Sequence, residues 1–118
     1  MSWAVAIGDD FYPEFFALPE DVRTEILALS RFLQQFGPQL GRPRVDTLKG
    51  SRQYEGTAIQ RSRRRVEVAF AFDTRRNAIL LVAGDKSGTS ERRFYRDLIR
   101  KADDRFDGHL ARLTNERK

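Results

Sequence analysis

The stretch VEVAFAFDTRRNAILLVAG, residues 66–84, decides the fold of this chain of 118 residues. In its first half, the large apolar residues Val and Phe alternate with Glu or Ala, which is typical of a strand with two different faces. Its second half, AILLVAG, is continuously apolar, which indicates a central strand that is covered on both faces. The segment DTRRN between them carries the turn-forming residues Asp73 and Asn77. We therefore predict an antiparallel hairpin.

Two amphipathic helices are predicted on either side of this hairpin. The segment LPEDVRTEILALSRFLQQFGP, residues 18–38, repeats apolar residues at helical spacing until Gly37 and Pro38 end the pattern. A second helix begins at about Glu91, after Thr89 or Ser90 as its N-cap. It places apolar residues on one face, at Phe94, Leu98, Ala102, Phe106, Leu110 and Leu113. Both helices are expected to form the core.

Three shorter elements complete the predicted fold. WAVAI (3–7) and VDTLKG (45–50) have the pattern of short strands, and DDFYPEFFAL (9–18) that of a short helix or turn. The order of elements predicts one α+β domain over residues 1–118. Its small antiparallel sheet is expected to pack against helices.

The composition excludes several kinds of site. The chain has no cysteine and one histidine, His109, so we expect no disulfide, no metal and no cofactor. We expect His109 to be structural or solvated, and no Asp–His pair to serve in proton transfer. The N-terminus has no signal-peptide pattern, and no stretch reaches the length of a membrane span. We therefore expect a cytoplasmic protein without a membrane partner.

The positive charge is concentrated in one segment. The chain carries a net charge of +5, and residues 42–65 contain eight basic residues against Asp46 and Glu55. Four of these are arginines among the five residues 61–65. A concentrated basic face fits a phosphate-rich partner or an acidic protein. The alternative is a solvated surface whose charge deters aggregation of the sheet edge.

Three blocks carry a resemblance to a known family: LKGSR (48–52), AFAFD (69–73) and GDKSG followed by RFY (84–95). Together they resemble the RelE/ParE-superfamily toxins, in particular the HigB-like, phage-derived branch. The resemblance implies a type II toxin that cleaves mRNA on the ribosome without a metal ion. It also implies a cognate antitoxin, of the helix-turn-helix type, that holds the toxin inactive. The implied fold is a compact antiparallel sheet packed against helices, in agreement with the prediction above.

Cleavage of this kind requires alignment of the ribose 2′-OH, stabilisation of the phosphate charge and proton transfer. Basic and phenolic side chains are the candidates for these tasks. We predict catalytic roles for Lys86, Tyr95 and Lys49. For Lys86 a merely solubilising role is an equal alternative, and for Tyr95 a place at the rim of the core is favoured. The residues predicted to bind RNA are Arg52, Arg63, Arg64, Arg65, Arg92 and Arg93.

One stretch, QYEGTAIQRSRRRVE (53–67), departs from the family pattern. Permitted codons exist for all of these residues such that the same nucleotides, read one position later, encode NMKELRFNAADGVWR. That string has the strand, polar turn and strand entry that the family pattern carries at this place. We therefore hypothesise a compensated frameshift. The arginines at 61–65 are then an out-of-frame product, and they attract phosphate without specificity.

The altered stretch is expected to weaken the chemistry more than the fold. It removes a lysine and an arginine, and it puts the acidic Glu67 where the family carries a basic residue. We therefore expect reduced or no cleavage. Two alternatives remain, an inactive toxin remnant that still binds its antitoxin and a non-catalytic basic module that binds nucleic acid. QYEGTAIQ is expected to form an edge strand despite Gly56, and residues 60–65 a mobile loop.

Overall fold

The predicted hairpin forms the middle of the protein. The computed structural model describes residues 3–40, 46–47, 55–61 and 64–116, with the backbone alone for 46–47, 55–61, 64 and 116. Within it, β4 (Arg64–Phe72) pairs antiparallel with β5 (Asn77–Asp85). The prediction of this hairpin is confirmed.

Three further strands extend the sheet to the order β1-β5-β4-β3-β2. These are β1 (Ala4–Ile7), β2 (Asp46–Thr47) and β3 (Glu55–Arg61). The pairs β2–β3 and β3–β4 are antiparallel, as predicted, whereas β1 runs parallel to β5. The helices lead from β1 to β2, and the chain then reverses at each step from β2 to β5, so that β5 lies beside β1 in the same direction.

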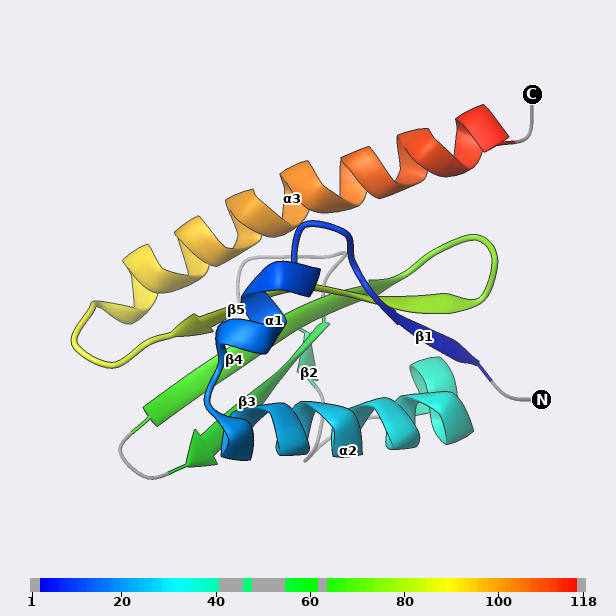
Figure 1. The fold of residues 1–118 in the computed structure, drawn as a ribbon. Helices are drawn as coiled ribbons and strands as arrows, with labels where there is room; N and C mark the ends of the chain where they lie inside the picture. The colour runs from blue at the N-terminus through cyan, green and yellow to red at the C-terminus, as the bar shows by residue number, and fades with distance from the viewer. Residues whose placement is uncertain (1–2, 41–45, 48–54, 62–63, 117–118) are drawn as a thin grey trace.

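Helices cover both faces of the sheet, as Figure 1 shows. On one face lies α2 (Glu20–Phe36), preceded by the short α1 (Tyr12–Ala17) and followed by a 3₁₀ turn at Gly37–Gln39. On the other face lies α3 (Glu91–Glu116). The α+β class with helices packed on a small sheet is confirmed. In the described part of the chain, no helix is both long enough and apolar enough to cross a membrane.

A β-bulge lets β5 serve both layers. Its register with β4 shifts between Ala69 and Phe70, so that Leu81 is the extra residue. Consecutive residues of a regular strand point to opposite faces, yet Leu81 and Val82 both join the cluster beneath α3. Leu80 belongs to the cluster beneath α2. The bulge therefore supplies the α3 layer with an additional buried side chain.

The expectation of a mobile loop over residues 60–65 is wrong for the described part of that segment. Strand β3 continues to Arg61 and β4 begins at Arg64, with the pairs Gln60↔Arg65 and Arg61↔Arg64 at the end of the ladder. Backbone pairing with β4 continues to the arginine run, because it does not depend on the side chains. The predicted strand in QYEGTAIQ is confirmed as β3, but β3 is not the edge, since Gly56 and Glu55 pair with β2.

The turn between β4 and β5 is organised by a buried carboxylate, Asp73. Its oxygens accept hydrogen bonds from the backbone N–H of Arg75 and of Asn77, at 2.8 and 2.9 Å. His109 Nε2 of α3 lies 2.9 Å from Asp73 Oδ2, and its ring stacks on Phe106. The expectation of a structural His109 is thereby supported. This Asp–His pair ties a turn to a helix.

One residue of this turn, Arg76, has a strained backbone conformation with a φ of 63°. This left-handed conformation is uncommon for residues other than glycine. The Arg76 guanidinium lies over the Trp3 ring, 4.9 Å from its centroid, and this contact offsets part of the cost. Trp3 in turn packs on Gly37, where a Cβ atom would collide with the indole ring.

Replacement of Asp73 by alanine is expected to destabilise the protein by about 2–4 kcal/mol, because it leaves buried donors without partners. Burial by itself raises the pKa of Asp73, but hydrogen bonds from His109, Asn77 and Arg75 outweigh it and hold this pKa below 3.8. The contribution is therefore complete near neutral pH and is lost as the pH falls through the lowered pKa. Urea unfolding at pH 7 and at about pH 3 measures it. Thr74→Ala, in the same turn, is the control, and equal effects of the two changes would contradict this role.

Candidate functional site

Glu67 stands at the centre of the candidate site. Strand β4 alternates, so Val66 and Val68 face the α2 layer while Ala69 and Ala71 face α3. Glu67 shares the α3 face, and its side chain is only 9% exposed. Its partner across the ladder is Gly84, which offers no side chain to cover it. An acidic side chain is therefore buried between the sheet and the first turn of α3.

Lys86 reaches the same place from the end of β5. Its backbone N–H donates to the Arg65 carbonyl at 3.0 Å, which extends the hairpin by one residue and fixes the position of the side chain. Lys86 Nζ lies 4.0 Å from Glu67 Oε2, and the Lys86 side chain is 22% exposed. The ammonium also lies 5.8 Å from the centroid of the Tyr95 ring. Lys86 is thus a partly buried cation with an internal acidic partner.

Tyr95 comes from the first turns of α3. The helix starts after Ser90, whose Oγ accepts the N–H of Arg93 at 3.3 Å, so the predicted N-cap is confirmed at Ser90. Close approach of α3 to β5 depends on Gly84, since a Cβ there would lie 3.0 Å from the Phe94 ring. Phe94 is buried, and the neighbouring Tyr95 is half-buried at the rim. The Tyr95 hydroxyl forms a hydrogen bond with the Glu67 carboxylate.

Burial shapes the protonation of this group. It raises the pKa of Glu67, against the opposing effects of Lys86 and of the hydrogen bond from Tyr95. Burial also raises the pKa of Tyr95, and the negative charges of Glu67 and Glu91 add to this effect. Tyr95 therefore remains a neutral hydroxyl at physiological pH and acts as a hydrogen-bond donor. Together, Glu67, Lys86 and Tyr95 form a compact triad.

The structure brings some of the predicted residues together and leaves others aside. Lys86 and Tyr95 meet, as their predicted shared role requires. Arg65 is exposed beside them on β4, and Arg92 is exposed three residues before Tyr95, on the same side of α3. Arg93 is exposed on the side of α3 that is turned away from the buried face.

The other predicted site residues cannot be placed. Lys49, Arg52 and Arg63 lie outside the described residues, and for Arg64 only the backbone is described. Their predicted roles stay predictions.

Sequence reasoning foresaw that Glu67 opposes a bound phosphate, but not that it contacts both Lys86 and Tyr95. The alternation of β4 places Glu67 on the face of Ala69, and this signal was available in the sequence. The contact with Lys86 depends on the register of β4 against β5, which the sequence does not reveal. Among the residues that the structure describes, no group of three or more His, Asp or Glu side chains could hold a metal ion.

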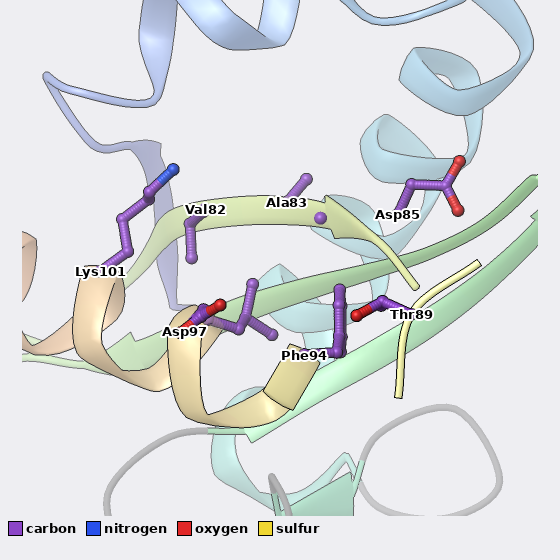
Figure 2. A pocket seen from close by; sticks show the side chains of 9 residues that line it. Val82, Ala83, Asp85, Thr89, Phe94, Asp97 and Lys101 are labelled. Carbon is purple, nitrogen blue, oxygen red and sulfur yellow. The ribbon is translucent and has the colours of Figure 1, made fainter. Parts of the chain in front are cut away.

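A small pocket flanks the other side of the first turns of α3. It has a volume of about 200 Å³ and includes Val82, Phe94 and Leu98 in its lining. Figure 2 shows Asp97 and Lys101 reaching it from α3, and Asp85 and Thr89 at its far end. Its mixture of charges does not favour a phosphate. Neither Lys86 nor Tyr95 lines it, so the triad and this pocket are separate features.

Comparisons with known proteins agree with this architecture. A family model described as "Phage derived protein Gp49-like" matches residues 13–107. A protein of Mycobacterium tuberculosis strain H37Rv named as a candidate toxin, HigB3, is 37% identical over 97 residues, which cover 82% of this chain and 84% of HigB3. A second candidate toxin of that organism, HigB2, is 38% identical over 93 residues. These cover 76% of this chain but 46% of HigB2, so the chain spans about half of that relative.

Among solved structures, the fold is similar to that of the Escherichia coli toxin RelE, in a double arginine-to-alanine mutant in the free state. The TM-score is 0.58 at 11% identity, with 74% of this chain and 86% of the RelE chain covered. At this identity the likeness shows the fold alone. The resemblance inferred from the sequence blocks is thereby confirmed. The chain belongs to the phage-derived Gp49-like family, is similar to the HigB-type toxins and has the RelE fold.

Proposed function

We propose that this chain derives from a metal-independent mRNA endonuclease that acts on the ribosome, and that Glu67 leaves it with little or no activity. One observation carries the proposal: the Glu67 carboxylate lies 4.0 Å from the Lys86 ammonium. Lys86 and Tyr95 would otherwise offer a cation and a hydroxyl donor to an RNA phosphate. Proteins of this type are paired with an antitoxin, and we propose one of the helix-turn-helix type as the partner.

The argument rests on charge. In RNA cleavage the phosphate gains negative charge in the transition state, and a prearranged cation stabilises it. A carboxylate that already satisfies Lys86 and Tyr95 competes for the same two groups. It also repels the phosphate, and the repulsion is strong because the carboxylate is largely buried. A basic residue at position 67 would reverse both effects.

The hypothesis of a compensated frameshift in residues 53–67 can be tested directly. Replacing residues 53–67 by NMKELRFNAADGVWR restores the family pattern and places an arginine at position 67. We expect induced expression of this restored chain to arrest bacterial growth, while the native chain does not. Growth curves and primer extension on a reporter mRNA measure the two effects. Equal arrest by the native chain would show that Glu67 does not disarm the site.

The single change Glu67→Arg separates the charge from the rest of the altered stretch. We expect it to raise mRNA cleavage at least tenfold over the native chain, because it frees Lys86 and adds a cation beside it. Glu67→Gln, which removes the charge without adding one, should give a smaller gain. If the restored chain is active and Glu67→Arg is not, the remainder of the stretch carries the defect.

The roles of Lys86 and Tyr95 are best measured in the restored chain. We expect Lys86→Ala and Tyr95→Phe each to lower the cleavage rate by about 10²–10³, the usual effect of removing one prearranged contact. Lys101→Ala is the matched control, since Lys101 is an exposed lysine on α3 away from the triad. Cleavage that survives both substitutions would assign the chemistry to other residues.

The raised pKa of Glu67 also predicts a dependence of stability on pH. The folded state binds the Glu67 proton more tightly than the unfolded state, so this group costs stability as the pH rises above its ordinary pKa of 4.5. We therefore expect Glu67→Gln to raise the melting temperature at pH 7 and to leave it unchanged at about pH 4. Asp104→Asn, at an exposed position of α3, is the control. A loss of stability at pH 7 would mean that the pair with Lys86 outweighs the cost of burial.

A further inference from the structure

An apolar patch on the helical side of the molecule has no role in the proposed chemistry. Tyr12 and Phe16 of α1 are 56% and 54% exposed, and Leu27 of α2 is 53% exposed. We call these three residues the α1–α2 patch. Single exposed apolar residues are ordinary, but a group of large ones on adjoining helices marks an interaction surface.

The patch is held in a fixed arrangement. Tyr12 and Phe16 pack edge to face, with ring centroids 5.0 Å apart. Arg23 of α2 donates to the Phe16 carbonyl at 2.9 Å, and Leu27 follows Arg23 by one helical turn. The side of α2 that carries Leu27 therefore adjoins α1.

A partly buried arginine, Arg105, anchors α1 beside the patch. Both terminal nitrogens of Arg105, on α3, donate to the Glu14 carboxylate at 2.9 and 2.6 Å. The same side chain donates to the Leu81 carbonyl at 2.8 Å. A bidentate pair of this kind fixes α1 against the sheet, so a partner that docks on it finds the aromatic rings already ordered.

The charge around the patch is opposite to that of the chain. Residues 9–27 contain six acidic residues and one basic residue, Arg23, whereas the whole chain carries +5. Two of the six, Glu14 and Asp9, are paired with Arg105 and Arg112 of α3. Asp10, Glu20 and Asp21 are exposed. This acidic rim repels nucleic acid, so the patch cannot share the RNA of the proposed function. It fits a polypeptide that carries both apolar and basic side chains.

We propose that the α1–α2 patch is where the antitoxin docks, through a segment with apolar residues for the patch and lysines or arginines for its rim. That the partner is an antitoxin rests on the proposed function. That the surface suits an apolar and basic polypeptide rests on its exposed residues alone. A second copy of this chain fits less well, because a two-fold contact would set the acidic rim against itself. The patch shares no residue with Glu67, Lys86 or Tyr95, so docking here holds the antitoxin without needing the triad.

The test uses the native chain and, as the candidate antitoxin, the product of the gene next to its own. We expect the triple variant Tyr12→Ser, Phe16→Ser and Leu27→Ser to raise the Kd measured by calorimetry at least about 100-fold. Phe36→Ser is the matched control, because Phe36 is also an exposed aromatic, 42% exposed, at the other end of α2. It should change the Kd by less than about threefold.

A second pair of variants examines the rim. Asp10→Asn with Glu20→Gln should weaken binding and reduce its dependence on salt, whereas Asp104→Asn with Asp107→Asn, on exposed positions of α3, should do neither. Circular dichroism and melting curves confirm that each variant is folded. If the rim pair and its control behave alike, charge complementarity is not the basis of recognition.

The outcomes separate this inference from the proposed function. Unchanged antitoxin affinity in the triple variant overturns the docking site, whatever the restored chain does to growth. Loss of self-association in the triple variant, with antitoxin affinity unchanged, makes the patch a contact between copies and also overturns it. In the restored chain, the triple variant should still arrest growth but no longer be neutralised by co-expressed antitoxin. If the restored chain without these substitutions does not arrest growth, the proposed function is contradicted, while the docking site is still decided by the affinity measurement.

Discussion

The structure depends on the burial of β5 on both of its faces. An apolar strand in the middle of a sheet is stable only when a layer covers each side, and here α2 and α3 supply these layers. The bulge at Leu81 serves the same need, because it turns two consecutive side chains toward α3. Arg105 and the Asp73–His109 pair then tie α3 to the sheet at separate points. The position of α3, and with it that of Tyr95, follows from these contacts.

That arrangement makes position 67 consequential. Every second residue of β4 faces α3, and at position 67 that residue is a glutamate. Its neighbours across the sheet and on the helix are Gly84, Lys86 and Tyr95. A carboxylate in this position is stabilised by the cation and the hydroxyl that would otherwise be free for an anionic ligand. The fold accepts the acid because Lys86 and Tyr95 offset part of the cost of its burial, and the proposed loss of activity follows from the same contacts.

The charge is distributed unevenly along the chain. The basic residues gather in the stretch 42–65 and at the start of α3, while the acidic residues gather around α1 and the start of α2. A phosphate-bearing partner is attracted to the first and repelled by the second. The proposed substrate and the proposed antitoxin would therefore not compete for every contact.

The sequence alone determined the hairpin, the two long helices and the α+β class, because these follow from local periodicity and turn chemistry. It also indicated Lys86 and Tyr95, through the family blocks around them, and the unfavourable charge of Glu67. Only the tertiary structure decided that the three side chains meet, since that depends on the register of β4 against β5 and on how closely α3 approaches Gly84. The parallel pairing of β1 and the Asp73–His109 contact were likewise decided between distant segments, and the pairing of Gln60 and Arg61 with Arg65 and Arg64 was decided by the backbone ladder. Local patterns specify which elements form, but only long-range packing specifies which side chains become neighbours.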